Sequence, residues 1–229
     1  FALKLENNFV NLSEIKAEVF YRSTGRNTRI TRGSKFAPFI KMPKGMGGYI
    51  DFTGPRRPTY VYGLRFERGR GSEHSPELGW GTKSRGYLKY MPTDTLSFSL
   101  MYQHQRENEW LNWYGDNLLA TFQRKQRTSI VEMEWFRNNI HELRIKAQMV
   151  AFTGREPQSF LGDLSGNLNP KDIYIPPITI SELAFQVRYR YEIMPLSYLY
   201  LVYSKGGRIS LQDEEDNLFS LYRLSLIHI

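Results

Sequence analysis

Apolar and polar side chains alternate with unusual regularity in residues 183–193, Leu-Ala-Phe-Gln-Val-Arg-Tyr-Arg-Tyr-Glu-Ile. Every odd position is apolar, and the even positions hold Ala, Gln, Arg, Arg and Glu. A period of two predicts a β-strand with one apolar face. At about 3.4 Å per residue and a tilt of about 40°, this strand would span about 28 Å along the membrane normal, close to the thickness of the hydrocarbon layer. Strands of soluble proteins are usually about half as long. The pattern therefore predicts a strand that crosses a bilayer.

Similar alternation recurs along most of the chain. It predicts strands at residues 1–9, 15–22, 49–53, 59–68, 83–91, 95–106, 110–114, 118–126, 128–137, 141–153, 183–193 and 198–204. Both faces of the last strand are apolar, so its orientation stays open. We expect about 13 strands in all, an odd number for a bacterial barrel, and therefore further strands upstream of Phe1.

Connection lengths predict the topology. Short turns are expected at residues 10–14, 54–58, 92–94, 115–117, 138–140 and 194–197, all on one side of the sheet. Longer loops at residues 23–46, 69–81, 154–179 and 205–217 then fall on the other side. Short turns on one side and long loops on the other are typical of outer-membrane barrels. The prediction is an all-β protein, an antiparallel up-and-down transmembrane β-barrel, of which this chain is an incomplete fragment.

Composition supports the barrel over helical spans. The longest unbroken apolar run covers residues 198–203, whereas a membrane helix needs about 20 apolar residues. Alternating strands escape this test because their lipid-facing and lumen-facing residues cancel in a hydropathy window. The 229 residues fit one domain, and the absence of Cys excludes disulfides and thiolate metal sites. We treat residues 1–229 as a single barrel domain.

The chain is basic, with a net charge of +8. Nucleic acid is a common partner of such chains. Here, however, the basic residues are spread over strands and turns, and the aromatic residues occupy the opposite positions of the pattern. We therefore expect no nucleic-acid partner. Side chains that line the lumen or contact outer-membrane lipid and lipopolysaccharide explain the charge.

One set of basic residues would line the inside of the barrel if the apolar faces meet lipid. Its members are Arg65, Arg144, Lys146, Arg188 and Arg190. A ring of positive charge selects anions or anionic sugars. Carboxylates share this face, namely Glu67, Glu132, Glu134 and Glu192. Because these opposite charges can pair, the pattern favours a self-paired interior over an anion-selective pore.

Aromatic residues form a second set of candidates. Trp110, Trp113 and Tyr114 could stack on sugar rings near a barrel rim, although a position in the aromatic belt at the membrane interface is the default. Tyr189 and Tyr191 lie at one end of the long strand, where an interfacial girdle is expected.

Catalytic and metal-binding patterns are absent from the sequence. The four His residues lack ligand spacing, and there is no nucleophile elbow or phosphate-binding glycine loop. Glu132 and Glu134 would lie about 7 Å apart on one face, as in an acid/base pair. Neutralisation by Arg144 and Lys146 on the next strand is the favoured interpretation. The acidic run at residues 213–216 could hold a divalent cation bridging lipopolysaccharide, but a solvated loop is favoured because calcium-loop spacing is missing. We predict no catalytic residues, metal or cofactor.

Three segments resemble a family of bacterial outer-membrane proteins. They are residues 180–207, the sequence Glu-Trp-Phe at 134–136 followed by His-Glu-Leu-Arg at 141–144, and Thr-Arg-Gly at 31–33. In that family a carbohydrate-binding domain of the family-9 type precedes a C-terminal barrel of unknown function. The resemblance implies an outer-membrane location and a role with glycans, and it supplies no catalytic residues. The binding domain would lie upstream of Phe1. Residues 224–229 match the translation of a transposon adapter used for sequencing libraries, which predicts an artefact at that end.

The predicted function is therefore an outer-membrane anchor or passage associated with carbohydrate binding or uptake, and not an enzyme. The ligand could be an oligosaccharide or polysaccharide, and the oligomeric state stays open. Two alternatives remain. A soluble antiparallel sugar-binding β-protein would need a second layer over its apolar face. An outer-membrane barrel hydrolase would need an acid pair or a nucleophile near a His at the rim.

Overall fold

The computed structural model describes residues 1–70, 78–138 and 140–211. These residues form thirteen strands: β1 (Ala2–Asn8), β2 (Glu14–Arg22), β3 (Gly25–Asn27), β4 (Ile40–Met42), β5 (Gly45–Thr53), β6 (Tyr60–Arg70), β7 (Gly81–Thr93), β8 (Leu96–Gly115), β9 (Leu118–Arg137), β10 (His141–Gly162), β11 (Leu168–Pro170), β12 (Ile178–Met194) and β13 (Ser197–Leu211). No helix long and apolar enough to cross a membrane occurs among them. The all-β prediction is confirmed.

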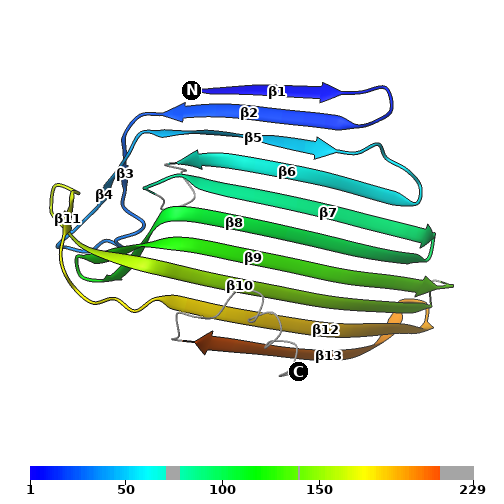
Figure 1. Ribbon diagram of the computed structural model, residues 1–229. Coiled ribbons are helices and arrows are strands. Elements are labelled where there is room, and N and C mark those ends of the chain that lie inside the picture. Colours follow the sequence, from blue (N-terminus) through cyan, green and yellow to red (C-terminus); the bar gives the residue numbers. More distant parts are fainter. Residues whose placement is uncertain (71–77, 139, 212–229) are drawn as a thin grey trace.

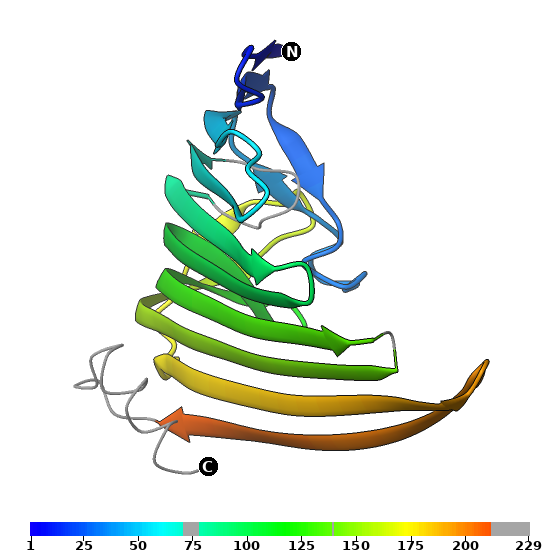
Figure 2. The same cartoon turned by 90° about the vertical axis from the view of Figure 1, so that its right-hand side faces the viewer.

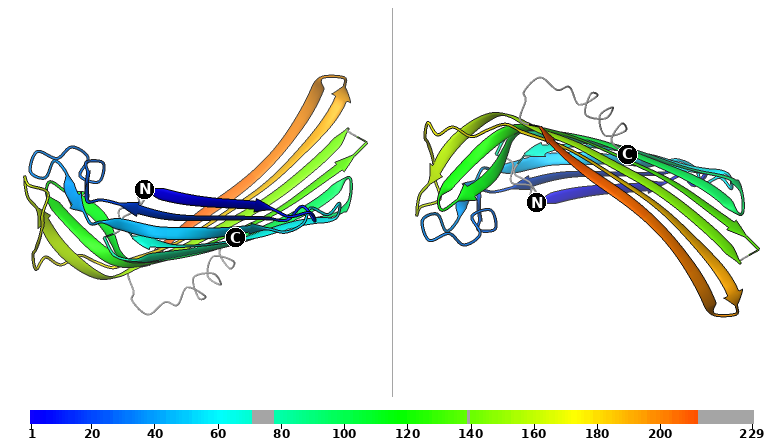
Figure 3. Two further views of the ribbon diagram at one scale, coloured as in Figure 1. Left: turned by 90° about the horizontal axis from the view of Figure 1, so that it is seen from above. Right: turned by 90° about the horizontal axis from the view of Figure 1, so that it is seen from below.

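Ten strands form an antiparallel meander in the order β1-β2-β5-β6-β7-β8-β9-β10-β12-β13, and β11 pairs with β10 to complete an eleven-stranded sheet. The sheet is twisted and curved (Figures 1, 2 and 3). Strands β1 and β13 form its two edges and do not pair with each other within the described ranges. The antiparallel up-and-down order was predicted correctly, and the described strands form an open sheet.

Several predicted strand boundaries were wrong, because interruptions of the alternating pattern were interpreted as strand ends. Strand β8 continues through residues 107–109 as a bulge between Glu107 and Trp110, and β9 crosses residue 127 without a break. Each is a single 20-residue strand. The turn at residues 115–117 therefore lies at the end of the sheet that carries the long connections, and its predicted place on the side of the other short turns was wrong. We call this the long-connection end, and the opposite one the short-turn end.

The predicted loop at residues 154–179 was also too long. Strand β10 runs to Gly162, and its register shifts at a bulge between Arg155 and Gln158, where Glu156 adopts a positive φ of 51°. A bulge adds a residue without ending the strand, so loop-like residues such as Gly154 and Pro157 are accommodated. The predicted loop at 205–217 begins as strand, since β13 reaches Leu211. Residues 212–217 and 224–229 lie outside the described part.

The strand register divides the sheet into two chemically different faces. The apolar face carries Leu3, Leu5, Ile15, Ala17, Val19, Ile50, Phe52, Tyr62, Leu64, Phe66, Leu88, Tyr90, Phe98, Leu100, Tyr102, Val131, Met133, Leu143, Ile145, Ala147, Phe185, Val187, Tyr189, Leu199 and Leu201. The opposite, polar face carries most of the charged residues of the strands, including Lys16, Asp51, Arg65, Glu132, Glu142, Arg144 and Arg190.

Large apolar side chains of the sheet are exposed, whereas two of its acids are buried. On the apolar face, Leu64 is 62% exposed and Leu100 48% exposed. On the polar face, Glu107 is 1% and Glu142 4% exposed. Monomeric soluble proteins rarely expose contiguous apolar surface on this scale. The sheet therefore exposes much of its apolar face and buries two of its charged residues.

The packed hydrophobic core lies at the long-connection end, where β8, β9 and β10 extend beyond their neighbours (Figure 1). On one face Leu111 and Leu119 pack with Ile40 of β4. On the other face Ala120 and Phe122 pack with Ile175, which precedes β12. Both faces of these strand tips are thus covered by chain from the long connections. We call this two-sided region the cap.

Candidate functional site

The polar face holds an extended array of charged side chains from nearly every strand of the sheet. Among the residues that the structure describes, ion pairs connect side chains of this face on nearly every strand. Most of them gather into three groups, over β1 to β6, over β7 to β12, and beside the cap, and one further pair joins Glu182 of β12 to Arg208 of β13.

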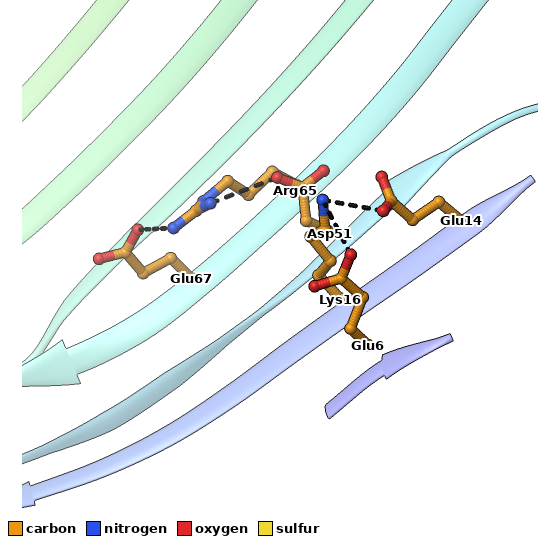
Figure 4. A network of polar contacts seen from close by, with 6 residues as sticks. All are labelled: Glu6, Glu14, Lys16, Asp51, Arg65 and Glu67. Atoms are coloured by element: carbon orange, nitrogen blue, oxygen red, sulfur yellow. Dashed lines mark hydrogen bonds and ion pairs between the residues drawn. The ribbon is translucent and has the colours of Figure 1, made fainter. Parts of the chain in front are cut away.

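The first group alternates in sign across four strands. Glu6, Lys16, Asp51 and Arg65 are successive register partners on β1, β2, β5 and β6. Lys16 Nζ lies 2.8 Å from Glu14 and 3.6 Å from Glu6. Arg65 lies 3.3 Å from Asp51 (Figure 4). Opposite charges facing one another across strands stabilise the pairing of those strands.

Arg65 also connects this group to an open groove. Its guanidinium lies 3.5 Å from Glu67 and stacks 3.8 Å from the centre of the Tyr49 ring. The groove has a volume of about 680 Å³, and these three residues line it together with Glu18 and Phe20. A guanidinium with two acidic partners and an aromatic ring is already well satisfied. Arg65, which lines this groove, is therefore already paired within the chain.

The second group centres on the buried carboxylate of Glu142 on β10. Arg190 Nε of β12 lies 2.9 Å from it, and Arg144 contacts its other oxygen. Arg144 also lies 3.7 Å from Glu134 of β9, and Lys89 of β7 lies 3.9 Å from the same carboxylate. One chain of opposite charges thus spans β7 to β12.

Glu132 and Glu134 are neutralised as predicted. Lys146 Nζ lies 2.6 Å from Glu132, and Arg144 contacts Glu134.

The third group is buried beside the cap. Arg124 Nη1 donates a hydrogen bond to Glu107 at 3.1 Å. The same guanidinium lies 5.1 Å from the Trp110 ring centre and 5.3 Å from that of Phe152. Glu107 is almost completely buried, and such a charge is tolerated only when it is paired. This group therefore lies at the boundary between the charged residues of the polar face and the cap.

All five predicted lumen cations lie on the polar face. Arg65, Arg144, Lys146 and Arg190 have carboxylate partners. Arg188 stacks 5.0 Å from the Tyr200 ring of β13, and Arg190 stacks 4.9 Å from Tyr198. These contacts show why both faces of β13 are apolar in sequence, since the tyrosines of its polar face cover the arginines of β12.

The aromatic candidates lie in three different environments. Trp110 and Tyr114 pack against Phe122, with ring centres 5.9 and 6.2 Å away. Trp113 points to the other face of the cap, where Arg32 lies 5.3 Å from its ring. Trp110 and Trp113 are therefore packed against other residues of the chain.

Tyr189 and Tyr191 lie on the apolar face at the short-turn end. Both rings stack on His141, at 6.0 and 5.1 Å, and the Tyr189 hydroxyl lies 2.6 Å from His141 Nδ1. The three rings therefore form one cluster at this end of the apolar face.

Sequence reasoning missed the two buried acids, Glu107 and Glu142. A signal for Glu142 was available, since it alternates with Arg144 on one predicted strand. For Glu107 it was hidden by the predicted strand break at residues 107–109. Among the residues that the structure describes, no cluster of His, Asp and Glu could hold a metal ion. His74, His228 and the acidic run 213–216 lie outside them.

Comparison of the chain with protein-family models, curated proteins and solved structures found no match.

Proposed function

We propose that this chain forms part of the wall of an outer-membrane β-barrel that serves as an anchor or passage in carbohydrate binding or uptake. The observation that carries the proposal is the large exposed apolar face of the sheet, which lies opposite a face of paired charges. A lipid bilayer is the solvent in which that arrangement is favourable.

Strand length and connection pattern support the same proposal. Strand β12 has 17 residues and β8 has 20. At about 3.3 Å per residue, either strand could cross a hydrocarbon layer of about 30 Å even when tilted. The cap then lies on the side of the long connections, which is the extracellular side of outer-membrane barrels.

The open edges determine what the complete barrel must contain. Unpaired backbone groups cost several kcal/mol each in lipid. Strands β1 and β13 therefore require partners, which we place in further strands of the same protein. Four of the five predicted lumen cations have carboxylate partners, which supports an anchor or a narrow passage over an anion-selective pore. The link to carbohydrate rests on the family resemblance.

A cysteine scan of β8 tests the proposal. Because the sequence contains no Cys, each introduced Cys is the only labelling site in it. Single Cys replacements of Ser97, Phe98, Ser99 and Leu100 would be labelled with a fluorophore in the protein purified from membranes and reconstituted in phosphatidylcholine vesicles. We expect a quencher attached to the lipid chains to quench the fluorophore at positions 98 and 100, which lie on the apolar face. The fluorophore at positions 97 and 99 should not be quenched.

The soluble sugar-binding alternative gives the opposite result. Positions 98 and 100 would then be shielded from the lipid quencher by a second protein layer, and the protein would remain in the aqueous fraction. That outcome would contradict the proposal. A barrel hydrolase would behave as a barrel in this scan and would be recognised by glycoside hydrolysis that a single carboxylate replacement abolishes.

A further inference from the structure

A cluster of cations lies on the apolar face at the long-connection end, away from the charge network of the polar face. It consists of Arg68 on β6, His104 and Arg106 on β8, and Lys125 and Arg127 on β9, and we call it the basic belt. Arg68, Arg106 and Lys125 are exposed. Across the described ranges, no ion pair includes any of these three side chains.

The register brings these residues together. Arg106 is the direct partner of Lys125, and His104 is the direct partner of Arg127. Thr82 of β7 pairs with both Arg68 and Arg106, so these two arginines lie two strands apart, about 10 Å. The two rows across β6 to β9 contain no carboxylate. Like charges placed side by side without an acid are unfavourable unless an anion joins them.

Exposed apolar side chains begin next to the basic belt, on the side toward the short-turn end. The next rows of the same face hold Leu64 and Tyr102, followed by Leu88, Leu100 and Val131. Successive positions on one face are about 7 Å apart along a strand. Leu64, Tyr102, Leu100 and Val131 are all more than 40% exposed. A molecule bound here would thus meet cations and hydroxyls at one end and exposed hydrocarbon along the rest.

We propose that the basic belt binds the phosphate groups of a phosphorylated lipid whose acyl chains lie along the apolar face. Arg106 and Lys125 form the centre of the site, and Arg68 forms its side on β6. The Thr82 hydroxyl is an additional hydrogen-bond donor. Guanidinium groups bind phosphate through paired, charge-assisted hydrogen bonds. This inference rests on the proposed membrane location, and it assigns the outer-leaflet lipid as a specific ligand.

The experiment uses the protein purified in zwitterionic detergent and lipid A with two phosphates as the probe. Binding is measured by native mass spectrometry, with dephosphorylated lipid A of the same acyl chains for comparison. The double variant Arg106→Gln/Lys125→Gln removes the centre of the belt. Each surface cation contributes about fivefold to the binding of an anionic lipid, so we expect a loss of about 25-fold. Binding of the dephosphorylated lipid should not change.

Two further variants keep the test decisive. Arg85→Gln removes an exposed cation of β7 on the opposite face and should leave lipid binding unchanged. Arg106→Lys/Lys125→Arg keeps the charges, should retain binding, and separates charge loss from misfolding. Equal binding of both lipids, an equal loss with Arg85→Gln, or displacement of the lipid by inorganic phosphate would overturn the inference. If the protein stays in the membrane but binds both lipids equally, the inference is overturned and the proposed function is not. If the protein does not stay in the membrane, the inference and the proposed function are both overturned.

Discussion

Individual charged residues in this protein are stabilised by neighbours on adjacent strands. Glu142 is the clearest example, because the residue is 4% exposed and its carboxylate lies between Arg144 and Arg190. A buried charge of this kind depends on its partners, since removing one member leaves the others uncompensated. By contrast, the pair between Glu132 and Lys146 is substantially exposed on both sides.

Replacing these two acids should therefore have different costs. We expect Glu142→Gln to lower the free energy of unfolding by about 3 kcal/mol. Glu132→Gln, the matched control, should cost about 1 kcal/mol or less, because exposed pairs are screened by solvent. Urea unfolding of both variants in the same lipid vesicles would measure the difference. Equal costs would show that the network around Glu142 is not important for stability.

A second residue-scale prediction concerns Asp163, in the connection between β10 and β11. The backbone N–H of Asn167 donates to its carboxylate at 2.8 Å, and the Asn167 side chain donates at 2.9 Å. These hydrogen bonds favour the ionised form and lower the pKa of Asp163 below its usual 3.8. Their contribution to the turn is therefore complete above pH 3.8 and is lost as the pH falls through the lowered pKa.

Carboxyl NMR titration of the protein would measure this pKa. Asp163→Asn should abolish the acid-induced change in the amide signal of Asn167. A midpoint at or above 3.8 would contradict the proposed role of the hydrogen bonds.

At the scale of elements, aromatic rings cover glycines on neighbouring strands. A Cβ at Gly63 of β6 would lie 2.3 Å from the Tyr87 ring of β7 and 2.9 Å from the carbonyl oxygen of Phe52. Gly63 therefore allows the Tyr87 ring to lie flat across the adjacent strand. Packing of this kind holds two strands in register where no side chain is available on one of them.

Gly63→Ala should displace the Tyr87 ring and lower the unfolding free energy by about 1–3 kcal/mol, as overpacking does. In a Tyr87→Ala background the same substitution should cost less, because only the contact with the Phe52 carbonyl remains. A double-mutant cycle by urea unfolding measures this coupling. Additive costs would show that the ring and the glycine are independent.

At the scale of the whole molecule, the sheet has two open edges and a large exposed apolar face. In lipid the apolar face is stabilised, while the edges must be paired. In water the apolar face would require a second layer. The cap shows how this chain buries apolar residues when it can, since both faces of the β8–β10 tips are covered there.

These two environments are distinguished by fractionation of the full-length protein. We expect it to remain in the outer-membrane fraction after a carbonate wash. The extracted protein should migrate differently on a gel before and after boiling, as closed barrels do. Release by carbonate without a mobility shift would favour the soluble sugar-binding alternative.

The sequence by itself determined the class of fold and the identity of the two faces. Side chains alternate along a strand by geometry alone, so residues such as Leu100 and Arg144 could be assigned to opposite faces from their positions in the pattern. The antiparallel order followed from the short turns, because two strands joined by a few residues must pair with each other. The pairing of Glu132 and Glu134 with Lys146 and Arg144 followed from the same alternation.

Only the tertiary structure decided where strands continue and what covers them. The bulges at Glu107 and Arg155 look like breaks in the sequence, because a bulge interrupts the period of two while the neighbouring strand still pairs. The cap joins Ile40 to Leu119 and Ile175 to Phe122, contacts between segments far apart in the chain that no local pattern specifies. The orientation of β13 likewise depended on its register with β12, since a strand with two apolar faces has no periodic signal of its own.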